Sequence, residues 1–545
     1  MVGVKNRGFF WPMFLALFLM AAGLRLWFDL QLIHNVDEGV LAAAGYIVHH
    51  GGIPYRDVWC HRGPLTHLYY AIVFALFGDY NIKAVHLMTT GLAFFSVFLI
   101  YLIAKEMSGK SSALAAAGLF FIFVSFLFLP HDSLASNPEM VMNPLLLAGV
   151  LFFVRSQGRG PHLALAGVLT GLAFLVKQTA LANLLLFWAF LFITGRTARR
   201  RFGKTLRSFL ILGFSFIAPF LIAFLFFSFK QSLDDFLFLF LTYNFIYLGE
   251  NTLAAAGGSL VLLASRFLSQ GWLLVSGLFA YVALLLKNHL STMEKEKKFR
   301  PFLLSWLVLT VLFVSLSGRF FGHYYLQALP PLCLMTAIVF MKLSSCAEPF
   351  LRWLGSSLML LGMITAILLN ALNPYLDRAV TAFRKDAQIS IRKMLAIEEE
   401  SEQKMLADTI KSLSCEEDRI FIWGIYPELY VLARRAPASR FVFPSFLTGL
   451  IPWVNVDPAV NTDDKIVPGS WEKLKADLAQ SGPELILDAT PGNRYWFGKY
   501  PPEKYEYLKE LLDERYKLVA FMNGVKIYKS SSAEESSSGV LERKE

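Results

Sequence analysis

Two acidic residues, Asp37 and Glu38, follow the first long apolar run of the chain and precede Gly39. A basic pair, His61 and Arg62, lies later in the same polar segment. A carboxylate at a membrane surface can take a proton from a hydroxyl group, and a nearby arginine can neutralise a phosphate that leaves with negative charge. Asp37 could instead cap the helix that follows, with Glu38 in solvent. Spacing alone leaves both interpretations open.

Long apolar runs flank these residues and must position them. Hydrophobic residues make up 55% and aromatic residues 15% of the 545 residues, more than a soluble protein of this length needs for its cores. Runs of about 16 to 25 apolar residues, long enough to cross a membrane as helices, recur from Phe9 to near Leu372 and then stop. We therefore expect a polytopic α-helical membrane protein followed by a separate domain.

The positive charges between the runs predict how the chain crosses the membrane. Lys5 and Arg7 keep the N-terminus inside, before an uncleaved first span. The short apolar stretch 64–78 is interpreted as an interfacial helix, because counting it as a span would invert every later loop. About eleven spans result. They lie near residues 9–29, 84–104, 112–130, 139–154, 162–176, 180–195, 207–228, 262–286, 302–317, 323–342 and 351–372.

This topology predicts a multi-pass protein of a bacterial-type inner membrane, with its C-terminal domain outside. The formal net charge of +10 does not indicate a nucleic-acid partner, because most Lys and Arg residues lie in short gaps between apolar runs. The four cysteines are scattered, without the paired spacing of a zinc or redox site. The bilayer is thus the partner that composition predicts.

Three domains are expected along the chain. Residues 1–373 form the membrane domain, with an outer loop over 30–83 that carries interfacial helices. Residues 374–529 alternate helical and strand-like runs, which predicts a small α/β domain. Its expected strands are 419–424, 440–443, 484–488, 516–521 and 524–528. No Gly-rich phosphate loop follows any of them, so no cofactor is assigned. The tail 530–545, rich in Ser and Glu, is expected to be disordered.

Several motifs together resemble one family. The acidic pair with Gly39, followed by a basic segment and the Pro64-Leu65 start of an apolar helix, is similar to polyprenyl-phosphate-dependent glycosyltransferases of the GT-C type. Among them it resembles the bacterial members of glycosyltransferase family 39, the dolichyl-phosphate-mannose-protein mannosyltransferase-like group that includes the lipid A aminoarabinose transferases. The similarity covers roughly residues 9–340 and includes Asn137-Pro-Glu139, Gly167–Thr179, Arg319–Leu326 and Pro330-Pro331.

The resemblance implies roles for the polar residues of these motifs. Asp37 matches the acid that is the proposed general base of the family, and Glu38 is its neighbour. Arg62, Lys177 and Arg319 match or lie near the basic groups that hold the donor phosphate. The predicted topology places all three at outer helix ends, where the rule for cytoplasmic Lys and Arg does not explain them. Lys177 could alternatively reach from a span end to the lipid head groups.

The remaining site candidates come from the same motifs. Glu139 matches an acid in the second outer loop of the family, and the late loop adds His323 and Tyr324. The chain departs from the aminoarabinose transferases at His61-Arg62-Gly63, where these enzymes have an acid followed by Lys and Pro. We therefore assign no metal, although a divalent ion or a phosphate could bind to His61 and His323 together with the acid of the first loop.

The function implied is an inverting transfer of a sugar from a polyprenyl-phosphate donor to an acceptor hydroxyl outside the membrane, without a nucleotide. The acceptor could be a glycan, a lipid or a protein. A transporter or lipid-linked glycan flippase is the main alternative, and a ligand sensor is another. The ionisable residues cluster at one membrane face rather than at the midplane, and no inverted repeat is visible, which favours the enzyme.

Overall fold

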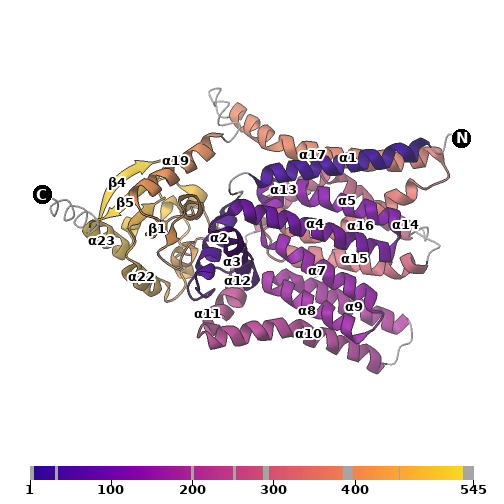
Figure 1. Cartoon of the computed structure of the whole chain (residues 1–545), viewed down its shortest axis with the longest axis horizontal. Coiled ribbons are helices and arrows are strands. Elements are labelled where there is room, and N and C mark those ends of the chain that lie inside the picture. Colours follow the sequence, from indigo (N-terminus) through magenta and orange to yellow (C-terminus); the bar gives the residue numbers. More distant parts are fainter. Residues whose placement is uncertain are drawn as a thin grey trace. The chain divides into compact units, whose positions relative to one another are not determined.

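The computed structural model describes residues 5–30, 33, 35–197, 202–249, 253–286, 294–384, 397–452 and 455–531. These residues form mostly helices, with one five-stranded sheet near the C-terminus (Figure 1). The chain divides into two compact units. We call the first the helical unit, drawn from Met1–His34, Val85–Phe226 and Leu253–Asp377, and the second the composite unit, drawn from Asn35–Ala84, Phe227–Thr252 and Arg378–Glu545.

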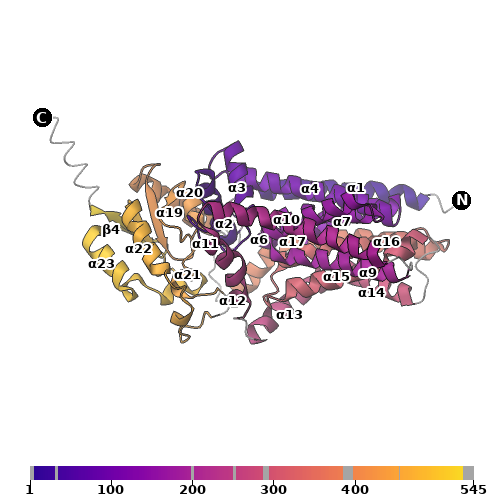
Figure 2. The ribbon, with the colours of Figure 1, turned by 90° about the horizontal axis from the view of Figure 1, so that it is seen from below.

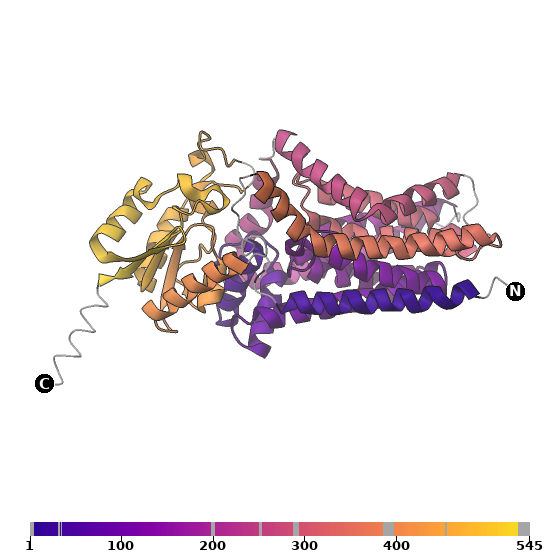
Figure 3. The same cartoon turned by 90° about the horizontal axis from the view of Figure 1, so that it is seen from above.

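The long helices of the helical unit run alongside one another, as the views from two further sides also show (Figures 2 and 3). Helices α5 and α16 form its centre, because most of their residues are buried. Helix α10 instead exposes large apolar residues such as Phe214 and Ile222, as expected of a surface that faces lipid. The long helices are α1 (Lys5–Asp29), α4 (Ile82–Met107), α5 (Lys110–Phe126), α7 (Pro138–Ser156), α8 (Gly160–Val176), α9 (Leu181–Thr197), α10 (Phe202–Phe229), α13 (Leu253–Ser269), α14 (Trp272–Leu286), α15 (Glu294–Ser315), α16 (Leu329–Leu343) and α17 (Pro349–Arg384). Short elements between them are α6 (Pro130–Ser133), η1 (Gln178–Ala180) and η3 (Gly322–Ala328).

Each predicted span coincides with helix in the described chain. Within the described ranges, seven helices are long and apolar enough to cross a membrane, and α13 with α14 forms an eighth candidate that is bent by 85°. The other three predicted spans are the shorter apolar helices α5, α8 and Phe299–Ser315. A helix of about 17 residues is near the lower limit for crossing a bilayer. The multi-pass α-helical architecture is therefore confirmed.

Three segments that are distant in the sequence build the composite unit. The expected domain boundary at residue 373 separates only the third of these segments from the membrane helices. Residues 35–84 and 227–252 belong with the C-terminal part rather than with the other membrane helices. The first segment carries α2 (Val36–His49) and α3 (Pro64–Phe77), and the second carries α11 (Leu233–Leu237), the π-helical turn η2 (Phe238–Thr242) and α12 (Tyr243–Gly249). The charge pattern predicts that all three segments lie on the outer side of the membrane. A single compact unit requires them to share a side, so the grouping agrees with the predicted topology.

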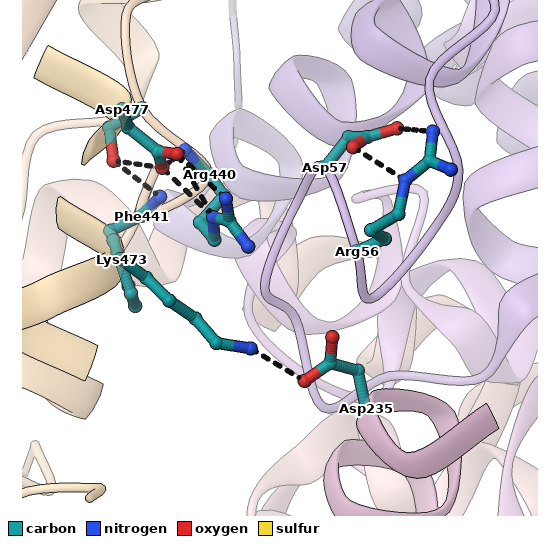
Figure 4. Close-up of polar contacts among 8 residues, drawn as sticks. Arg56, Asp57, Asp235, Arg440, Phe441, Lys473 and Asp477 are labelled. Atoms are coloured by element: carbon teal, nitrogen blue, oxygen red, sulfur yellow. Dashed lines mark hydrogen bonds and ion pairs between the residues drawn. The ribbon is translucent and has the colours of Figure 1, made fainter. Parts of the chain in front are cut away.

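Polar contacts hold these segments together (Figure 4). Lys473 donates to Asp235 at 2.9 Å, which joins the C-terminal segment to α11. Arg440 pairs with Asp477 at 2.8 Å, and its carbonyl oxygen accepts a hydrogen bond from the backbone N–H of Trp59 at 2.9 Å. The outer loop is therefore attached to the C-terminal segment through main-chain as well as side-chain contacts.

The C-terminal segment is an α/β domain, as expected. Its strands are β1 (Arg419–Trp423), β2 (Ala436–Pro437), β3 (Leu485–Asp488), β4 (Tyr516–Met522) and β5 (Val525–Ser530), in the order β2-β1-β3-β5-β4. Strand β1 is parallel to β2 and β3, whereas β5 is antiparallel to β3 and β4. Its helices are α19 (Ile397–Leu413), α20 (Glu428–Ala433), α21 (Ser445–Thr448), α22 (Ser470–Ser481), α23 (Glu506–Arg515) and the short turns η4 (Asp463–Lys465), η5 (Arg494–Lys499) and η6 (Pro502–Lys504).

The prediction of a strand at 440–443 is wrong. The strand that this region contributes to the sheet is instead β2, at residues 436–437. The backbone of Arg440 is engaged elsewhere, because its N–H donates to Asp477 and its carbonyl accepts from Trp59. The expected disordered tail, 530–545, lies almost entirely outside the described residues.

Helix α3 has the features of the predicted interfacial helix. It has 14 residues, about 21 Å at the α-helical rise and too short to span a bilayer. One stripe, formed by Leu68, Ile72 and Leu76, is exposed, while the opposite side packs on α2 through Tyr70. An exposed apolar stripe opposite a packed face suits a helix that lies in the membrane surface.

Candidate functional site

The first turn of α2 presents the acidic pair. Asn35 occupies the N-cap position, and its Oδ1 accepts a hydrogen bond from the backbone N–H of Glu38 at 2.9 Å. Asp37 is therefore the second helical residue and not the cap, so the capping interpretation is wrong. Glu38 is 1% exposed, so the interpretation of a solvated side chain is also wrong. The positive end of the helix dipole favours both carboxylates at this position.

Asp37 forms an ion pair with Arg62. Both side chains are partly accessible, at 28% for Asp37 and 17% for Arg62. The hydroxyl of Tyr55 donates to the Arg62 carbonyl at 2.8 Å, which holds the loop that presents the guanidinium. Burial alone would lower the pKa of Arg62, but Asp37 and Cys60 raise it above its ordinary value. The guanidinium thus stays charged beside the candidate base.

His61 lies next to this pair but is held by another segment. Its carbonyl oxygen accepts from Asn244 Nδ2 at 2.9 Å, and its ring lies 5.8 Å from the ring of Tyr243. Asp37 faces a guanidinium, and a fixed cation beside a carboxylate opposes the binding of a metal ion there. The residues around Asp37 therefore do not fit a metal centre that includes His61.

The C-terminal domain also reaches the start of α2. A Cβ atom on Gly39 would lie 2.7 Å from the backbone nitrogen of Glu428. The buried Glu428 pairs with Arg494 at 3.4 Å, and the Arg494 guanidinium lies 3.7 Å from the ring centroid of Tyr426. Burial, followed by the carboxylates of Glu428 and Asp37, raises the pKa of Tyr495 to about 12.

Sequence reasoning missed these C-terminal neighbours because they are separated from the acidic pair by most of the chain. One signal was available: a glycine in the first turn of a helix costs stability unless another backbone approaches it closely. A second signal is visible only in three dimensions. Asn493, Tyr495 and Trp496 all have positive φ, at 47°, 50° and 62°, and such strain in residues other than glycine concentrates at functional sites.

A second polar cluster lies within the helical unit. Lys177 donates to Glu139, and its ammonium group lies 3.5 Å from the ring centroid of Tyr324. Helix α8 ends at Val176, and Lys177 adopts extended backbone angles before η1. Glu139 belongs to the first turn of α7 and Tyr324 to η3, so three separate elements supply the cluster. The structure thus brings together three of the residues that the sequence motifs selected.

This environment differs from that of a lysine that reaches for lipid head groups. Glu139 is 1% exposed and Lys177 is 21% exposed, so the pair is largely shielded. Glu139 Oε2 is buried and has no hydrogen-bond partner among the described residues. A shielded ammonium group with an aromatic ring on one side suits a ligand that brings a negative charge.

His323 and Arg319 lie close to this cluster in sequence. His323 Nδ1 lies 2.6 Å from Asp132 Oδ1, and its backbone N–H donates to the same oxygen at 3.2 Å. Burial would raise the pKa of Asp132, but His323 and His131 lower it below its ordinary value. Arg319 is buried, at 3% exposure. His323 is thus bound by a carboxylate that was not among the selected residues, and the role of Arg319 in a phosphate pocket stays a prediction.

The chain is similar to one family model and to several solved structures. Residues 61–223 match the family model described as dolichyl-phosphate-mannose-protein mannosyltransferase. ArnT from Cupriavidus metallidurans, crystallised with undecaprenyl phosphate, has a TM-score of 0.61 and 12% identity, over 95% of this chain and 97% of that chain. The apo state of the same protein has a TM-score of 0.58 and 12% identity, over 95% of this chain and 98% of that chain. The Archaeoglobus fulgidus oligosaccharyltransferase tethered with an acceptor peptide has a TM-score of 0.49 and 14% identity, over 96% of this chain and 74% of that chain.

A search of curated protein sequences found no match. The similarity to ArnT over nearly the full length of both chains shows that the fold is of the GT-C type. The family match covers Arg62, Glu139 and Lys177, which carry part of the resemblance recognised in the sequence. The predicted fold class and the resemblance to GT-C glycosyltransferases are therefore confirmed.

Proposed function

We propose that this chain transfers a sugar from a polyprenyl-phosphate donor to an acceptor hydroxyl on the extracytoplasmic face of the membrane, with inversion at the anomeric carbon. The observation that carries the proposal is the Asp37–Arg62 pair on the first turn of α2. Because Asn35 provides the N-cap of α2, the Asp37 carboxylate is not needed as the cap. We assign it the role of the base.

The proposed reaction is a single displacement. Asp37 takes the proton of the acceptor hydroxyl, and the oxygen attacks the anomeric carbon of the donor sugar. The bond between this carbon and the phosphate oxygen breaks, and the electron pair leaves with the polyprenyl phosphate. Arg62 orients the Asp37 carboxylate through their ion pair and keeps the surroundings positive. No nucleotide is needed, because the phosphate of the lipid is the leaving group.

The Lys177 cluster supports a phosphate ligand. Its ammonium group is preoriented by Glu139 and Tyr324 and can exchange part of its contact with Glu139 for a phosphate oxygen. The structure of ArnT, which has the same type of fold, contains undecaprenyl phosphate, and this supports a polyprenyl phosphate as the sugar carrier here. Arg319 is proposed as a further phosphate ligand, and Glu38, His61 and His323 as residues that surround the substrates.

The identity of the sugar is left open, and the acceptor is a hydroxyl group of a glycan, a lipid or a protein. An outer face is proposed for the reaction because the three segments of the composite unit are those that the charge pattern places outside. Asp37, Arg62 and the C-terminal contacts of α2 all belong to this unit. In this proposal, the placement of Asp37 therefore depends on the C-terminal domain, which packs against the start of α2.

The test compares two substitutions at the start of α2 in detergent-purified protein, supplied with labelled polyprenyl-phosphate sugars and a panel of acceptors. Asp37→Asn keeps the size of the side chain and an oxygen that can accept from Arg62, but it removes the basic carboxylate, so transfer should collapse while the protein still folds. Asn35→Ala removes the cap, so stability should fall by about 1 kcal/mol while transfer persists. Near-parental turnover of Asp37→Asn would defeat the assignment of the base.

A further inference from the structure

Three potential metal ligands converge at the far end of α2. His49 is the last residue of the helix, His50 is its C-cap, and Asp79 follows the C-cap glycine of α3. One ligand atom from each residue lies within 4.8 Å of the others. His50 Nε2 is 2.9 Å from Asp79 Oδ2, and His49 Nε2 is 3.8 Å from Asp79 Oδ1. We call these three residues the His-His-Asp cluster.

The surrounding contacts hold the cluster in place. The ring of Tyr46 stacks on Tyr80 with 4.6 Å between centroids, and it lies 4.4 Å from the ring of His50. The hydroxyl of Tyr80 donates to the carbonyl of Arg435 at 3.0 Å, and Arg434 donates to the carbonyl of Asp79 at 3.1 Å. The helix, the turn after α3 and the C-terminal segment thus fix the cluster jointly. Ligands held in place before binding lose little entropy when an ion arrives.

A simple ion pair explains this arrangement only in part. A single histidine would satisfy Asp79, yet two imidazoles point at it, and Asp79 Oδ1 is buried with no hydrogen-bond partner among the described residues. A cation bridging the three side chains would use this oxygen. His49 and His50 are also accessible, at 32% and 50% exposure, so an ion could enter from solvent.

The ligand types select the class of ion. Two imidazole nitrogens and one carboxylate oxygen, with at least one position open to water, match Zn²⁺ and other divalent first-row transition metals. Mg²⁺ and Ca²⁺ prefer sets made of oxygen atoms and would be poorly served here. We propose that the His-His-Asp cluster binds a divalent transition-metal ion, with Zn²⁺ as the best match, and that this ion links the end of α2 to the turn after α3.

The proposed ion acts on structure rather than on the chemical step. His49 is twelve residues beyond Asp37 on the same helix, which corresponds to about 18 Å. An ion at that distance cannot touch a reacting atom near Asp37. It can restrict the movement of α2, the helix that carries the acidic pair at its other end, and so strengthen the contacts between the outer loop and the C-terminal domain.

Zn²⁺ binding to the full chain in detergent tests the proposal. The protein is stripped with a chelator, and ZnCl₂ is titrated in competition with a chromophoric zinc indicator. We expect one high-affinity ion per chain, and affinity lowered by about tenfold or more in His50→Ala and in Asp79→Asn. His162→Ala, which removes a histidine of α8 in the other unit, should bind like the parent. MgCl₂ should not compete.

Thermal unfolding supplies a second readout that does not depend on sugar transfer. Zn²⁺ should raise the unfolding temperature of the parent and of His162→Ala, because an ion that binds only the folded state stabilises it. It should leave Asp79→Asn unchanged. The proposal is overturned if the parent binds Zn²⁺ only at millimolar concentration, or if it binds no more tightly than a variant lacking all three side chains.

Discussion

Replacing Gly39 by alanine should destabilise the composite unit, although the same substitution stabilises most helices. Gly39 lies in the first turn of α2, where alanine would be favoured by about 1 kcal/mol over glycine in an open position. The added Cβ would lie 2.7 Å from the backbone nitrogen of Glu428, 3.0 Å from the carbonyl carbon of Pro427 and 3.1 Å from the Cα of Glu428. These are backbone atoms, so no side chain can rotate away to make room.

The magnitude follows from the two opposing effects. Inserting a methyl group into a packed contact usually costs about 1–3 kcal/mol, and a contact of 2.7 Å belongs at the upper end because the backbone itself must move. The gain in helix propensity offsets about 1 kcal/mol of this cost. We therefore expect a net loss of about 1–2 kcal/mol, confined to the contact between α2 and α20. Transfer should fall as well, because Asp37 lies two residues before the altered position.

Gly91→Ala provides the matched control. Gly91 lies inside α4, and a Cβ atom there would meet nothing within 4 Å. This variant should be as stable as the parent or slightly more stable. Thermal unfolding in detergent measures the stability, and hydrogen exchange of peptides from α2 and α20 locates the change. If Gly39→Ala unfolds at the same temperature as Gly91→Ala and α20 exchanges at the parental rate, the close backbone contact does not exist in solution.

Three further outcomes test other parts of the molecule. Lys177→Met should weaken the binding of a polyprenyl-phosphate analogue about tenfold or more, because a charged hydrogen bond is worth about 1.5–3 kcal/mol. Lys110→Met, at an exposed helix start, should bind the analogue normally, and equal binding by both variants contradicts the phosphate role. Arg440→Ala should lower stability by about 1–3 kcal/mol, because its multiple bonds to the partly buried carboxylate of Asp477 are lost (Figure 4). Lys473→Ala should cost about 1 kcal/mol or less, since its ion pair is more exposed, and thermal unfolding that ranks the two variants in the opposite order is the contrary result. Alkaline phosphatase fused after Glu545 should be active, and bright fluorescence from a fusion that matures only in the cytoplasm would reverse the topology.

Local properties of the sequence determined the membrane architecture. A segment in lipid must satisfy its own backbone hydrogen bonds, so each span appears in the sequence as a continuous apolar run, and the flanking charges predict its direction. The short run of α3 was recognised as too short to span for the same reason. Motifs with chemically distinctive side chains also identified Glu139, Lys177 and Tyr324, and in the structure Lys177 contacts both of the others.

Other features depend on contacts between residues far apart in the chain, and only the tertiary structure decided them. Asn35 and Asp37 are both good helix caps, and the backbone angles, rather than residue type, select Asn35. The run 440–443 has the composition of a strand, but its backbone groups bond to other partners. The composite unit and the His-His-Asp cluster join segments that share no local pattern, because side-chain periodicity reports which face of an element is buried but not which distant element covers it.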